Sequence, residues 1–326
     1  MTQHRVKLKD IAERAKVSLT AASMFINGKA KKYHLADATC ERIRKAIKEL
    51  NYVPNIHARA IASKRTLLLG MIISSDIETS FWLNALSGIE EVIARDDYHM
   101  ILSVSHEDPG KELAAIEFML NKGIDGLLIS TLPGKNDNHD FLRDLNKRMP
   151  VVTLNQRVEG VSGAFNDNYF GGELAAKCLL KHGHKRIAYI GTANIPRVIA
   201  FDECLSKHGI KYTAFATVKD FLKNYQKFDA VFCFSDYVAL ELYNLTGDKN
   251  ISIPQDFSVI GYDNMEFVQF THPRLTTIEQ SKKEMGISAG EIIMKALKTD
   301  KSDRQIIQKV FKPKLIIAES VSQFES

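Results

Sequence analysis

The sequence predicts a small all-α head of the helix-turn-helix type, joined to an α/β body of two doubly wound lobes with parallel sheets. Three observations predict this organisation. The chain has 326 residues, more than one average domain. In its first 50 residues, apolar side chains recur at the spacing of short helices. From Thr66 on, strand-like apolar runs alternate with helical segments, which is typical of parallel sheets covered by helices.

Two short helices joined by a tight turn are expected near the N-terminus. The first covers about residues 8–15, because four apolar side chains share one face: Leu8, Ile11, Ala12 and Ala15. Ser18 is a good N-cap for the second helix. The inward side chains of that second helix are Ala22, Phe25 and Ile26. A third helix is expected over about residues 37–50.

The turn between the first two helices, residues 16–18, has the length of the turn in a helix-turn-helix. Many such turns carry glycine where this chain has Lys16. A left-handed backbone at a lysine costs about 1 kcal/mol or more, and a contact between the lysine and a phosphate would offset that cost.

Positive charge is concentrated at the N-terminal end. Residues 1–66 carry fifteen Lys and Arg against five Asp and Glu, a formal charge of +10. Because the whole chain carries +5, the remaining residues carry −5. A cationic head on a mildly acidic body indicates a polyanionic partner at one end only.

In a helix-turn-helix the second helix enters the major groove of DNA, and its first exposed residues meet the base edges. These are Leu19, Thr20 and Met24. Leu19 and Met24 cannot make bidentate hydrogen bonds, so we expect apolar contacts, for instance with thymine methyl groups. Partial burial in the head's own core is the alternative. Further DNA contacts, several of which set register on the backbone, are expected from Lys9, Ser18, Ser23, Asn27, Lys29, Lys31, Lys32, Tyr33 and His34.

Residues 55–63 form the second basic segment. Pro54 ends what precedes it, and Asn55 can cap a short helix that carries Ala58, Arg59 and Ile61. So short a helix is marginal in water, and it would become ordered when paired and docked in a minor groove. Ile61 is the candidate apolar wedge between base steps, with an ordinary linker residue as the alternative.

The body shows two series of strands. The first is expected at residues 67–73, 98–104, 126–130 and 151–155, with helices near 81–96 and 110–122. A second series starts at Gly163 and contains strands near 187–190, 230–233 and 258–262. In doubly wound lobes of this kind, a ligand cleft is expected at the carboxyl ends of the strands.

Several classes of protein are disfavoured by what the sequence lacks. No run approaches the ~18 apolar residues of a membrane span, and the N-terminus has no apolar core like that of a signal peptide, so we expect a cytoplasmic protein without membrane contact. The four cysteines lie far apart, which favours reduced thiols. No phosphate-binding loop, nucleophile elbow or metalloprotease motif is present, so no catalytic residue, cofactor or metal site is expected.

Taken together, these segments resemble the LacI/GalR family of bacterial regulators nearly end to end. The head is similar to the family pattern "DIA..AGVS..TVSR.LNG", from which Lys16, Ala21 and Met24 depart. Residues 51–59 fit the family's "NY.PN..AR.L" entry to the hinge helix, and Ile61 falls where its wedge leucine sits. Residues 27–33 and 56–59 are similar to the fructose and sucrose repressors, a narrower branch.

The resemblance implies a body like periplasmic sugar-binding proteins. Residues 165–172 are similar to "V..DN..GG", residues 235–236 to "ND", and residues 261–277 to "G.DD…P.LTT". Residues 183–188 are similar to "GH..IA", a structural motif, so neither His182 nor His184 is expected to be a ligand residue. Residues 197–201 fall on "R..GF", although the chain around them is shorter than is usual in the family.

Carried over residue by residue, the effector-binding positions are Asp76, Phe81, Trp82, Ser130, Arg197, Ser235, Asp236 and Asp263. Sugars favour carboxylate acceptors, guanidinium donors and an aromatic face, which Asp263, Arg197 and Trp82 would supply. Trp82, the only tryptophan, is expected at the cleft mouth. A surface charge on a helix is the alternative for Arg197.

The implied domains are a DNA-binding domain at 1–52, a hinge at 53–66 and a body at 67–326. The first lobe would comprise about 67–162 and 280–308, and the second about 163–277 and 309–326. The implied function is a repressor, a homodimer or tetramer, whose affinity for operator DNA is controlled by a sugar or sugar phosphate between the lobes. A ligand acting as corepressor is the alternative within the family; a sugar-handling enzyme and a sugar receptor are those outside it.

Overall fold

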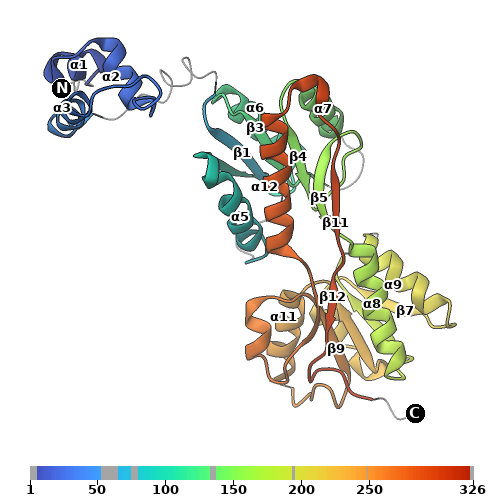
Figure 1. Cartoon of the computed structure of the whole chain (residues 1–326). Helices are drawn as coiled ribbons and strands as arrows, with labels where there is room; N and C mark the ends of the chain where they lie inside the picture. The colour runs from blue at the N-terminus through green and yellow to red at the C-terminus, as the bar shows by residue number, and fades with distance from the viewer. Residues whose placement is uncertain are drawn as a thin grey trace. The chain divides into compact units, whose positions relative to one another are not determined.

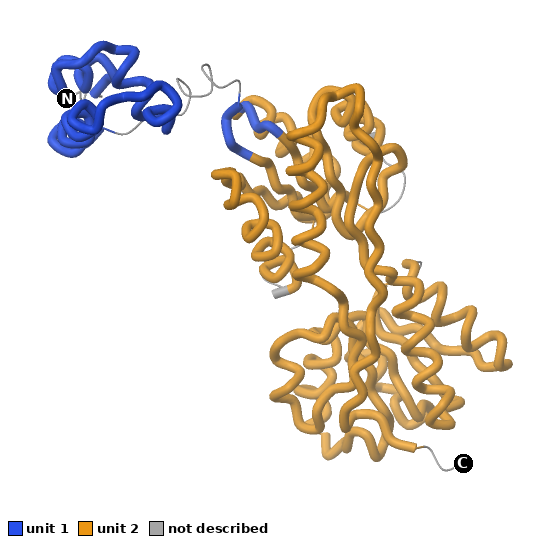
Figure 2. Tube along the Cα trace, in the orientation of Figure 1, with its two compact units in different colours: residues 1–68, 123–125 blue, residues 69–122, 126–326 orange. Residues whose placement is uncertain are grey.

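The computed structural model describes residues 6–52, 65–74, 80–132, 137–192, 195–247 and 249–323. The chain divides into two compact units, residues 1–68 with 123–125 and residues 69–122 with 126–326 (Figure 2). The expected hinge contacts at Asn55, Ala58, Arg59 and Ile61 lie outside the described residues, as does Asp76.

The head in the first unit contains three helices, as the sequence predicts. They are α1 (Leu8–Ala15), α2 (Leu19–Ile26) and α3 (Asp37–Glu49). Their shared core consists of small and aliphatic residues on the predicted faces: Ile11, Ala12, Ala15, Ala22, Ile43 and Ala46. Phe25 and Ile26 are partly buried and pack against this core, which confirms the inward face predicted for α2.

The turn between α1 and α2 contains the left-handed residue that the sequence analysis describes as energetically unfavourable for a lysine. Lys16 is left-handed, with φ 53° and ψ 52°. The amide of Val17 donates to the carbonyl of Ala12 at 3.0 Å, which closes the end of α1. Ser18 then caps α2, because its side-chain oxygen accepts a hydrogen bond from the amide of Ala21 at 3.1 Å.

A carboxylate fixes the segment that leads out of the first unit. Asp125 accepts a hydrogen bond from the amide of Thr66 at 3.0 Å and from the amide of Leu67 at 2.9 Å. The hydroxyl of Thr66 donates to the carbonyl of Gly123 at 2.7 Å. These contacts hold a backbone that is left-handed at Leu67, with φ 59°.

The first sheet of the body has the strand order β11-β5-β4-β3-β1-β2 (Figure 1). Its strands are β1 (Leu68–Ile73), β2 (His99–Val104), β3 (Gly126–Ile129), β4 (Val151–Leu154), β5 (Ser162–Asn166) and β11 (Gln308–Phe311). The pairs β1–β3, β3–β4, β4–β5 and β5–β11 are parallel. The β1–β3 register places Leu69 opposite Gly126.

Four helices accompany this sheet: α5 (Ser80–Ile93), α6 (Pro109–Asn121), α7 (Asp137–Asn146) and α12 (Lys282–Lys298). The short 3₁₀ helices η1 (Ala94–Asp96) and η4 (Lys301–Asp303) follow α5 and α12. The long helix α12 packs against α5 and across β3, β4, β5 and β11 (Figure 1). Since α12 lies far along the chain from these strands, the first lobe is built from two separate stretches of sequence.

The second sheet has the order β12-β10-β9-β8-β6-β7. Its strands are β6 (Ile187–Ile190), β7 (Tyr212–Phe215), β8 (Ala230–Cys233), β9 (Ser258–Asp263), β10 (Thr276–Glu279) and β12 (Lys314–Ile316). Only β12 runs antiparallel among the pairs with an assigned register, against β10. Its helices are α8 (Asn168–Lys181), α9 (Pro196–Ser206), α10 (Val218–Leu222), α11 (Asp236–Gly247), η2 (Tyr225–Lys227) and η3 (Glu266–Phe270).

The change of lobe comes later than the sequence predicts. The prediction starts the second lobe at Gly163 and assigns residues 309–326 to it. The structure instead pairs Gly163 with Thr153 of β4 in the first sheet, and β11 pairs with β5 there as well. Because these short strands are held by their neighbours in the first sheet, the chain passes between the lobes after β5, after β10 and after β11. None of the described helices is long and apolar enough to cross a membrane.

Candidate functional site

The exposed face of α2 is uncharged. Leu19 is 53% exposed and Thr20 is also exposed, whereas Ser23 and Met24 are half-buried. Neither Leu19 nor Met24 belongs to the apolar cluster that forms the core of the head. The alternative of partial burial therefore does not hold for Leu19, and Met24 is sheltered without being part of that core.

The polar side chains at the two ends of α2, Ser18 and Asn27, already form hydrogen bonds within the head. The side-chain amide of Asn27 donates to the carbonyl of Ser23 at 2.9 Å and to its hydroxyl oxygen at 3.2 Å. Ser18 accepts from Ala21, as described above. Asn27 therefore acts first as a cap for the end of α2, and its expected DNA contact would have to come from its remaining amide atoms.

The other residues expected to contact DNA backbone are exposed. They are Lys9, Lys29, Lys31, Lys32, Tyr33 and His34. Lys9 pairs with Glu13 at 3.6 Å, and the ammonium of Lys32 lies 5.9 Å from the ring centre of Tyr33. Surface pairs of this kind contribute little to stability, so these cations remain available to a polyanion.

A second candidate site lies in the body, around Arg197 on the first turn of α9. This side chain is 9% exposed. Its Nη1 donates to the carbonyl of Phe234 at 2.8 Å and its Nη2 to the Oδ1 of Asn168 at 3.4 Å. The guanidinium lies 3.7 Å from the ring centre of Tyr262 and 5.1 Å from that of Phe234. The alternative of a surface charge is therefore wrong, because Arg197 is buried and held on three sides.

Glycines of the "GG" motif bring α8 against this arginine. A Cβ on Gly172 would lie 1.8 Å from the backbone oxygen of Arg197, and one on Gly171 would lie 2.2 Å from the hydroxyl of Tyr262. A side chain at Gly172 would push α8 away from α9, and one at Gly171 would push it away from the ring of Tyr262 on β9. The same close approach lets Asn168, the first residue of α8, accept a hydrogen bond from the hydroxyl of Tyr262 at 2.9 Å.

Asp236 is fully buried at the start of α11 and has a structural task. Its carboxylate accepts hydrogen bonds from the amide of Met265 at 2.7 Å and from the hydroxyl of Thr277 at 2.6 Å. Burial, and next the negative charge of Asp263, raise the pKa of Asp236 to about 7. With one hydrogen bond on each oxygen, Asp236 holds the loop after β9 onto β10.

Asp263, at the end of β9, is the freer carboxylate. It is half-buried with φ 108°, and its Oδ1 accepts a hydrogen bond from the side chain of Gln280 at 2.5 Å. Burial raises the pKa of Asp263, while the charges of Arg197 and Lys282 oppose that rise. Asp263 is therefore close enough to Arg197 for the two charges to interact, and their joint role in one ligand site stays a prediction.

Lys282, the first residue of α12, links this site to the first lobe. It is buried, and its ammonium donates to the carbonyls of Asp263 at 2.7 Å and Asn264 at 2.8 Å. Sequence reasoning missed the supporting residues Asn168, Tyr262, Gln280 and Lys282. The first two lie within motifs that the sequence analysis identifies, so a role for them could have been sought there.

The remaining expected effector residues are not brought to Arg197 by any contact among the described residues. Ser130 lies beside Ser74, with 3.2 Å between hydroxyl oxygens, and Ser235 accepts from the amide of Val238 at 3.4 Å. Phe81 and Trp82 form an edge-to-face pair with ring centres 5.2 Å apart. Trp82 is only 3% exposed, so its ring is buried on the first turn of α5, and its place at a cleft mouth stays a prediction.

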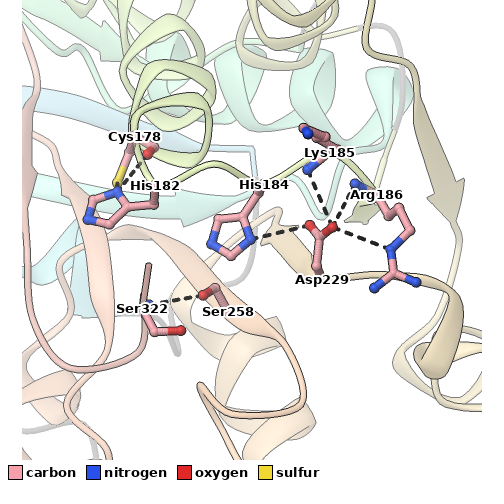
Figure 3. A network of polar contacts seen from close by, with 8 residues as sticks. All are labelled: Cys178, His182, His184, Lys185, Arg186, Asp229, Ser258 and Ser322. Atoms are coloured by element: carbon pink, nitrogen blue, oxygen red, sulfur yellow. Dashed lines mark hydrogen bonds and ion pairs between the residues drawn. The ribbon is translucent and has the colours of Figure 1, made fainter. Parts of the chain in front are cut away.

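His184 of the "GH" motif and His182 just before it have structural partners (Figure 3). The Nδ1 of His184 lies 3.2 Å from the carboxylate of Asp229, and both side chains are buried. Asp229 also accepts a hydrogen bond from the amide of Arg186 at 3.0 Å. The Nδ1 of His182 forms a hydrogen bond with the carbonyl oxygen of Cys178 at 2.8 Å. Among the described residues, no group of three or more His, Cys, Asp or Glu is placed to hold a metal ion.

Comparison with known proteins places these features in a family. A family model for "Bacterial regulatory proteins, lacI family" matches residues 7–55. One for the "Periplasmic binding proteins and sugar binding domain of LacI family" matches residues 66–200, and one for a "Periplasmic binding protein-like domain" matches residues 176–321.

Similar proteins align over nearly the whole chain. The "HTH-type transcriptional repressor PurR" of Mannheimia succiniciproducens is 32% identical over 97% of this chain and 98% of its own length. A LacI family transcriptional regulator from Silicibacter pomeroyi has a similar structure, with a TM-score of 0.82, 25% identity and 97% and 99% of the two chains covered. The Lac repressor dimer bound to operator shares the fold, with a TM-score of 0.84, 20% identity and 98% and 100% coverage. The chain belongs to the LacI family of bacterial regulatory proteins.

Proposed function

We propose that this protein is a sequence-specific transcriptional repressor that binds operator DNA as a homodimer. The observation that carries the proposal is the head itself: an uncharged, exposed face of α2 followed by the exposed cations Lys29, Lys31 and Lys32. A groove-reading face beside phosphate-binding cations is the arrangement that a helix-turn-helix needs. The name of the Mannheimia relative, a transcriptional repressor, supports the same activity.

Two copies are proposed because one head is small. A single α2 exposes only a few residues to base edges, and two symmetric heads double the number of contacts on a site with two half-sites. The residues before the body, at 55–61, are proposed to complete the contact in the minor groove, with Ile61 as the wedge.

The ligand is proposed to be an uncharged, hydroxyl-rich small molecule such as a sugar. Arg197 offers donors and Asp263 an acceptor, and hydroxyl groups use both. The ammonium of Lys282 is already engaged with two carbonyls. Asp263 interacts electrostatically with both of these cations, and Asp236 interacts with Lys282. A sugar phosphate would therefore meet no surplus positive charge here, and the neutral sugar is favoured.

Fructose and sucrose come first among the candidate ligands, because residues 27–33 and 56–59 are similar to the repressors for these sugars. Binding between the lobes would favour one body conformation and thereby shift the affinity of the heads for DNA. We propose that the bound ligand lowers the affinity for the operator, so that the protein is released from DNA. The opposite effect would be stronger operator binding in the presence of the ligand.

The test begins with DNA. The full chain is incubated with a library of random-sequence duplexes, bound duplexes are enriched over several rounds, and the affinity for the enriched site is measured at several salt concentrations. We expect one pseudo-palindromic sequence and a steep fall in affinity with salt, by about 0.9 logarithmic unit per phosphate contact for each tenfold rise in salt. Absence of any enriched sequence at low salt would refute the repressor proposal.

The ligand is tested separately. D-fructose, sucrose and D-fructose 1-phosphate are titrated while the fluorescence of Trp82, the only tryptophan, is followed. The same compounds are then added to the complex with the enriched duplex, which reads the sign of coupling. Arg197→Met should abolish a response to ligand and leave DNA binding intact. A tighter response to the phosphate than to the sugar would contradict the neutral-ligand proposal.

A further inference from the structure

The second helix of the head lacks every side chain that discriminates bases by paired hydrogen bonds. Those side chains are the guanidinium, ammonium, amide and carboxylate groups of Arg, Lys, Asn, Gln, Asp and Glu. The helix α2, Leu19–Ile26, contains only Leu, Thr, Ala, Ser, Met, Phe and Ile. The adjacent Asn27 has its amide nitrogen engaged with Ser23. Reading of bases by α2 must therefore use some other property of the base edge.

The exposed side chains of α2 indicate which property. Leu19 stands in the first turn at 53% exposure, outside the apolar cluster of the head. Met24 is half-buried and also lies outside that cluster. An apolar side chain in this position contributes to affinity only when a partner removes its surface from water. In the major groove, the base-edge group of matching chemistry is the C5-methyl group of thymine.

We infer that this protein selects its DNA site by apolar contact of Leu19 and Met24 with thymine methyl groups. The inference rests on the proposed function, because it concerns how the same head distinguishes sequences. Hydroxyl contacts from Thr20 and phosphate contacts from the cations at residues 29–32 set affinity and register, while the methyl groups set sequence.

The expected magnitude follows from the size of a methyl group. Burial of one CH₂ or CH₃ group changes an equilibrium constant by about fourfold. A symmetric site carries each contact twice, so removal of one contacted methyl from both half-sites should weaken binding by about 16-fold. Base changes that keep the methyl in place should have smaller effects at these positions.

The experiment uses the full chain and the duplex enriched from the random library. Each thymine is replaced in turn by deoxyuridine, which removes the methyl group and retains the hydrogen-bonding pattern. The affinity for each duplex is measured by fluorescence anisotropy. We expect about fourfold weaker binding at one or two thymines in each half-site and no change at thymines in flanking sequence.

Two protein variants identify the side chain. In Leu19→Ala and in Met24→Ala, the loss on deoxyuridine substitution should disappear at one position of each half-site, a different position for each variant. In the control Lys31→Ala, affinity should fall for every duplex by the same factor, and the loss on deoxyuridine substitution should persist.

Three outcomes decide between the alternatives. Deoxyuridine within twofold of thymine at every position, combined with strong losses for base-pair replacements there, would overturn the inference in favour of hydrogen-bond or shape reading. A deoxyuridine loss that is unchanged in both Leu19→Ala and Met24→Ala would overturn the assignment to these side chains. Failure to enrich any sequence would instead refute the repressor function, so the two proposals fail in different ways.

Discussion

The guanidinium of Arg197 and the ring of Tyr262 lie 3.7 Å apart, and both side chains donate a hydrogen bond to the same oxygen, Oδ1 of Asn168. The arginine is thereby stacked on one face and tied at two of its nitrogens. Its Nε is buried, and no hydrogen-bond partner for it is found among the described residues. A buried donor without a partner is costly, and a ligand that accepts from it gains correspondingly.

Tyr262→Phe should loosen this arrangement and leave the ring in place. The variant loses the hydrogen bond to Asn168 and keeps the stacking on Arg197. We expect the free energy of unfolding to fall by about 1 kcal/mol and the affinity for the proposed sugar ligand to fall several-fold, with operator binding unchanged. Urea unfolding and Trp82 fluorescence titration measure the two effects.

Tyr225→Phe, in η2, is the matched control for that experiment. Tyr225 lies 6.0 Å, ring centre to ring centre, from Phe257 and far in sequence from the arginine. Its hydroxyl can be removed without touching Asn168. Equal losses of ligand affinity in the two variants would show that Tyr262 does not position Arg197.

Gly172→Ala should separate α8 from α9. The added Cβ would lie 1.8 Å from the backbone oxygen of Arg197, a distance that requires the helices to move. We expect a loss of about 1–3 kcal/mol or more in the free energy of unfolding, because backbone cannot yield as a flexible side chain does. The ligand response should fall as well, since Arg197 sits on the displaced helix.

Gly247→Ala tests the same substitution where space is open. Apart from its chain neighbours and the backbone of its own helix, no described residue places a heavy atom within 4 Å of the position that a Cβ would occupy at Gly247, the last residue of α11. Stability should change little or rise slightly, as alanine favours the helix. Chemical unfolding of both variants checks the pair, and similar losses in both would argue against close helix packing as the cause.

Strands buried on both faces were the easiest elements to predict. Residues 187–190 and 230–233 form β6 and β8 with the predicted bounds, since each is a short run of apolar residues between turn signals. The switch of lobes after β5 could not be predicted in the same way. Pairing of Gly163 with Thr153 depends on which sheet edge is free, and that is a property of the assembled fold.

The candidate ligand site was predictable in part. The family motifs point to Arg197 and Asp263, because an arginine and an aspartate at these positions supply the donor and the acceptor that hydroxyl groups need. The surroundings of these two residues come from separate segments, and Lys282 reaches them from the start of α12. Burial of Trp82 likewise follows from how α5 packs, which one helix's own sequence does not determine.

The pKa of Asp236 predicts how stability depends on pH. The folded protein has a pKa of about 7 at this carboxyl against 3.8 for an unperturbed one. Between these values the folded state holds a proton that the unfolded chain has released, so the free energy of unfolding falls as pH rises from about 4 to about 7. Three pKa units correspond to about 4 kcal/mol, which sets the upper scale of the effect.

Asp236→Asn should remove most of this pH dependence. The amide keeps an acceptor for the amide of Met265 and offers a donor to the hydroxyl oxygen of Thr277. Urea unfolding at pH 5 and pH 7.5 should show a smaller difference for the variant than for the parent protein. Asp202→Asn, at an exposed position on α9, should keep the parent's difference. An unchanged difference in Asp236→Asn would contradict the assignment.

Replacement of Lys16 by glycine should change stability and DNA affinity in opposite directions. Its backbone is left-handed, which costs about 1 kcal/mol in a residue with a side chain. Lys16→Gly should therefore stabilise the head by about 1 kcal/mol. If the ammonium meets a phosphate, the same change should weaken operator binding and reduce the salt slope by about one contact.

Lys16→Arg is the matched control for that experiment. This variant keeps both the positive charge and the left-handed strain, so its affinity and salt slope should match those of the parent. Thermal unfolding and anisotropy at several salt concentrations provide the two readouts. A stabilised Lys16→Gly head with undiminished operator affinity would show that the lysine contacts no phosphate.

Asp125 predicts local order in the segment that enters the body. Its two oxygens accept from the amides of Thr66 and Leu67, and Leu67 is held at φ 59°. Asp125→Ala should leave both amides without these partners, so their hydrogen exchange with solvent should accelerate strongly. Asp125→Asn retains one acceptor oxygen and should protect one of the two amides. Exchange measured by NMR resolves the two residues, and unchanged protection in Asp125→Ala would mean that the backbone at residues 66–67 is held by something other than this carboxylate.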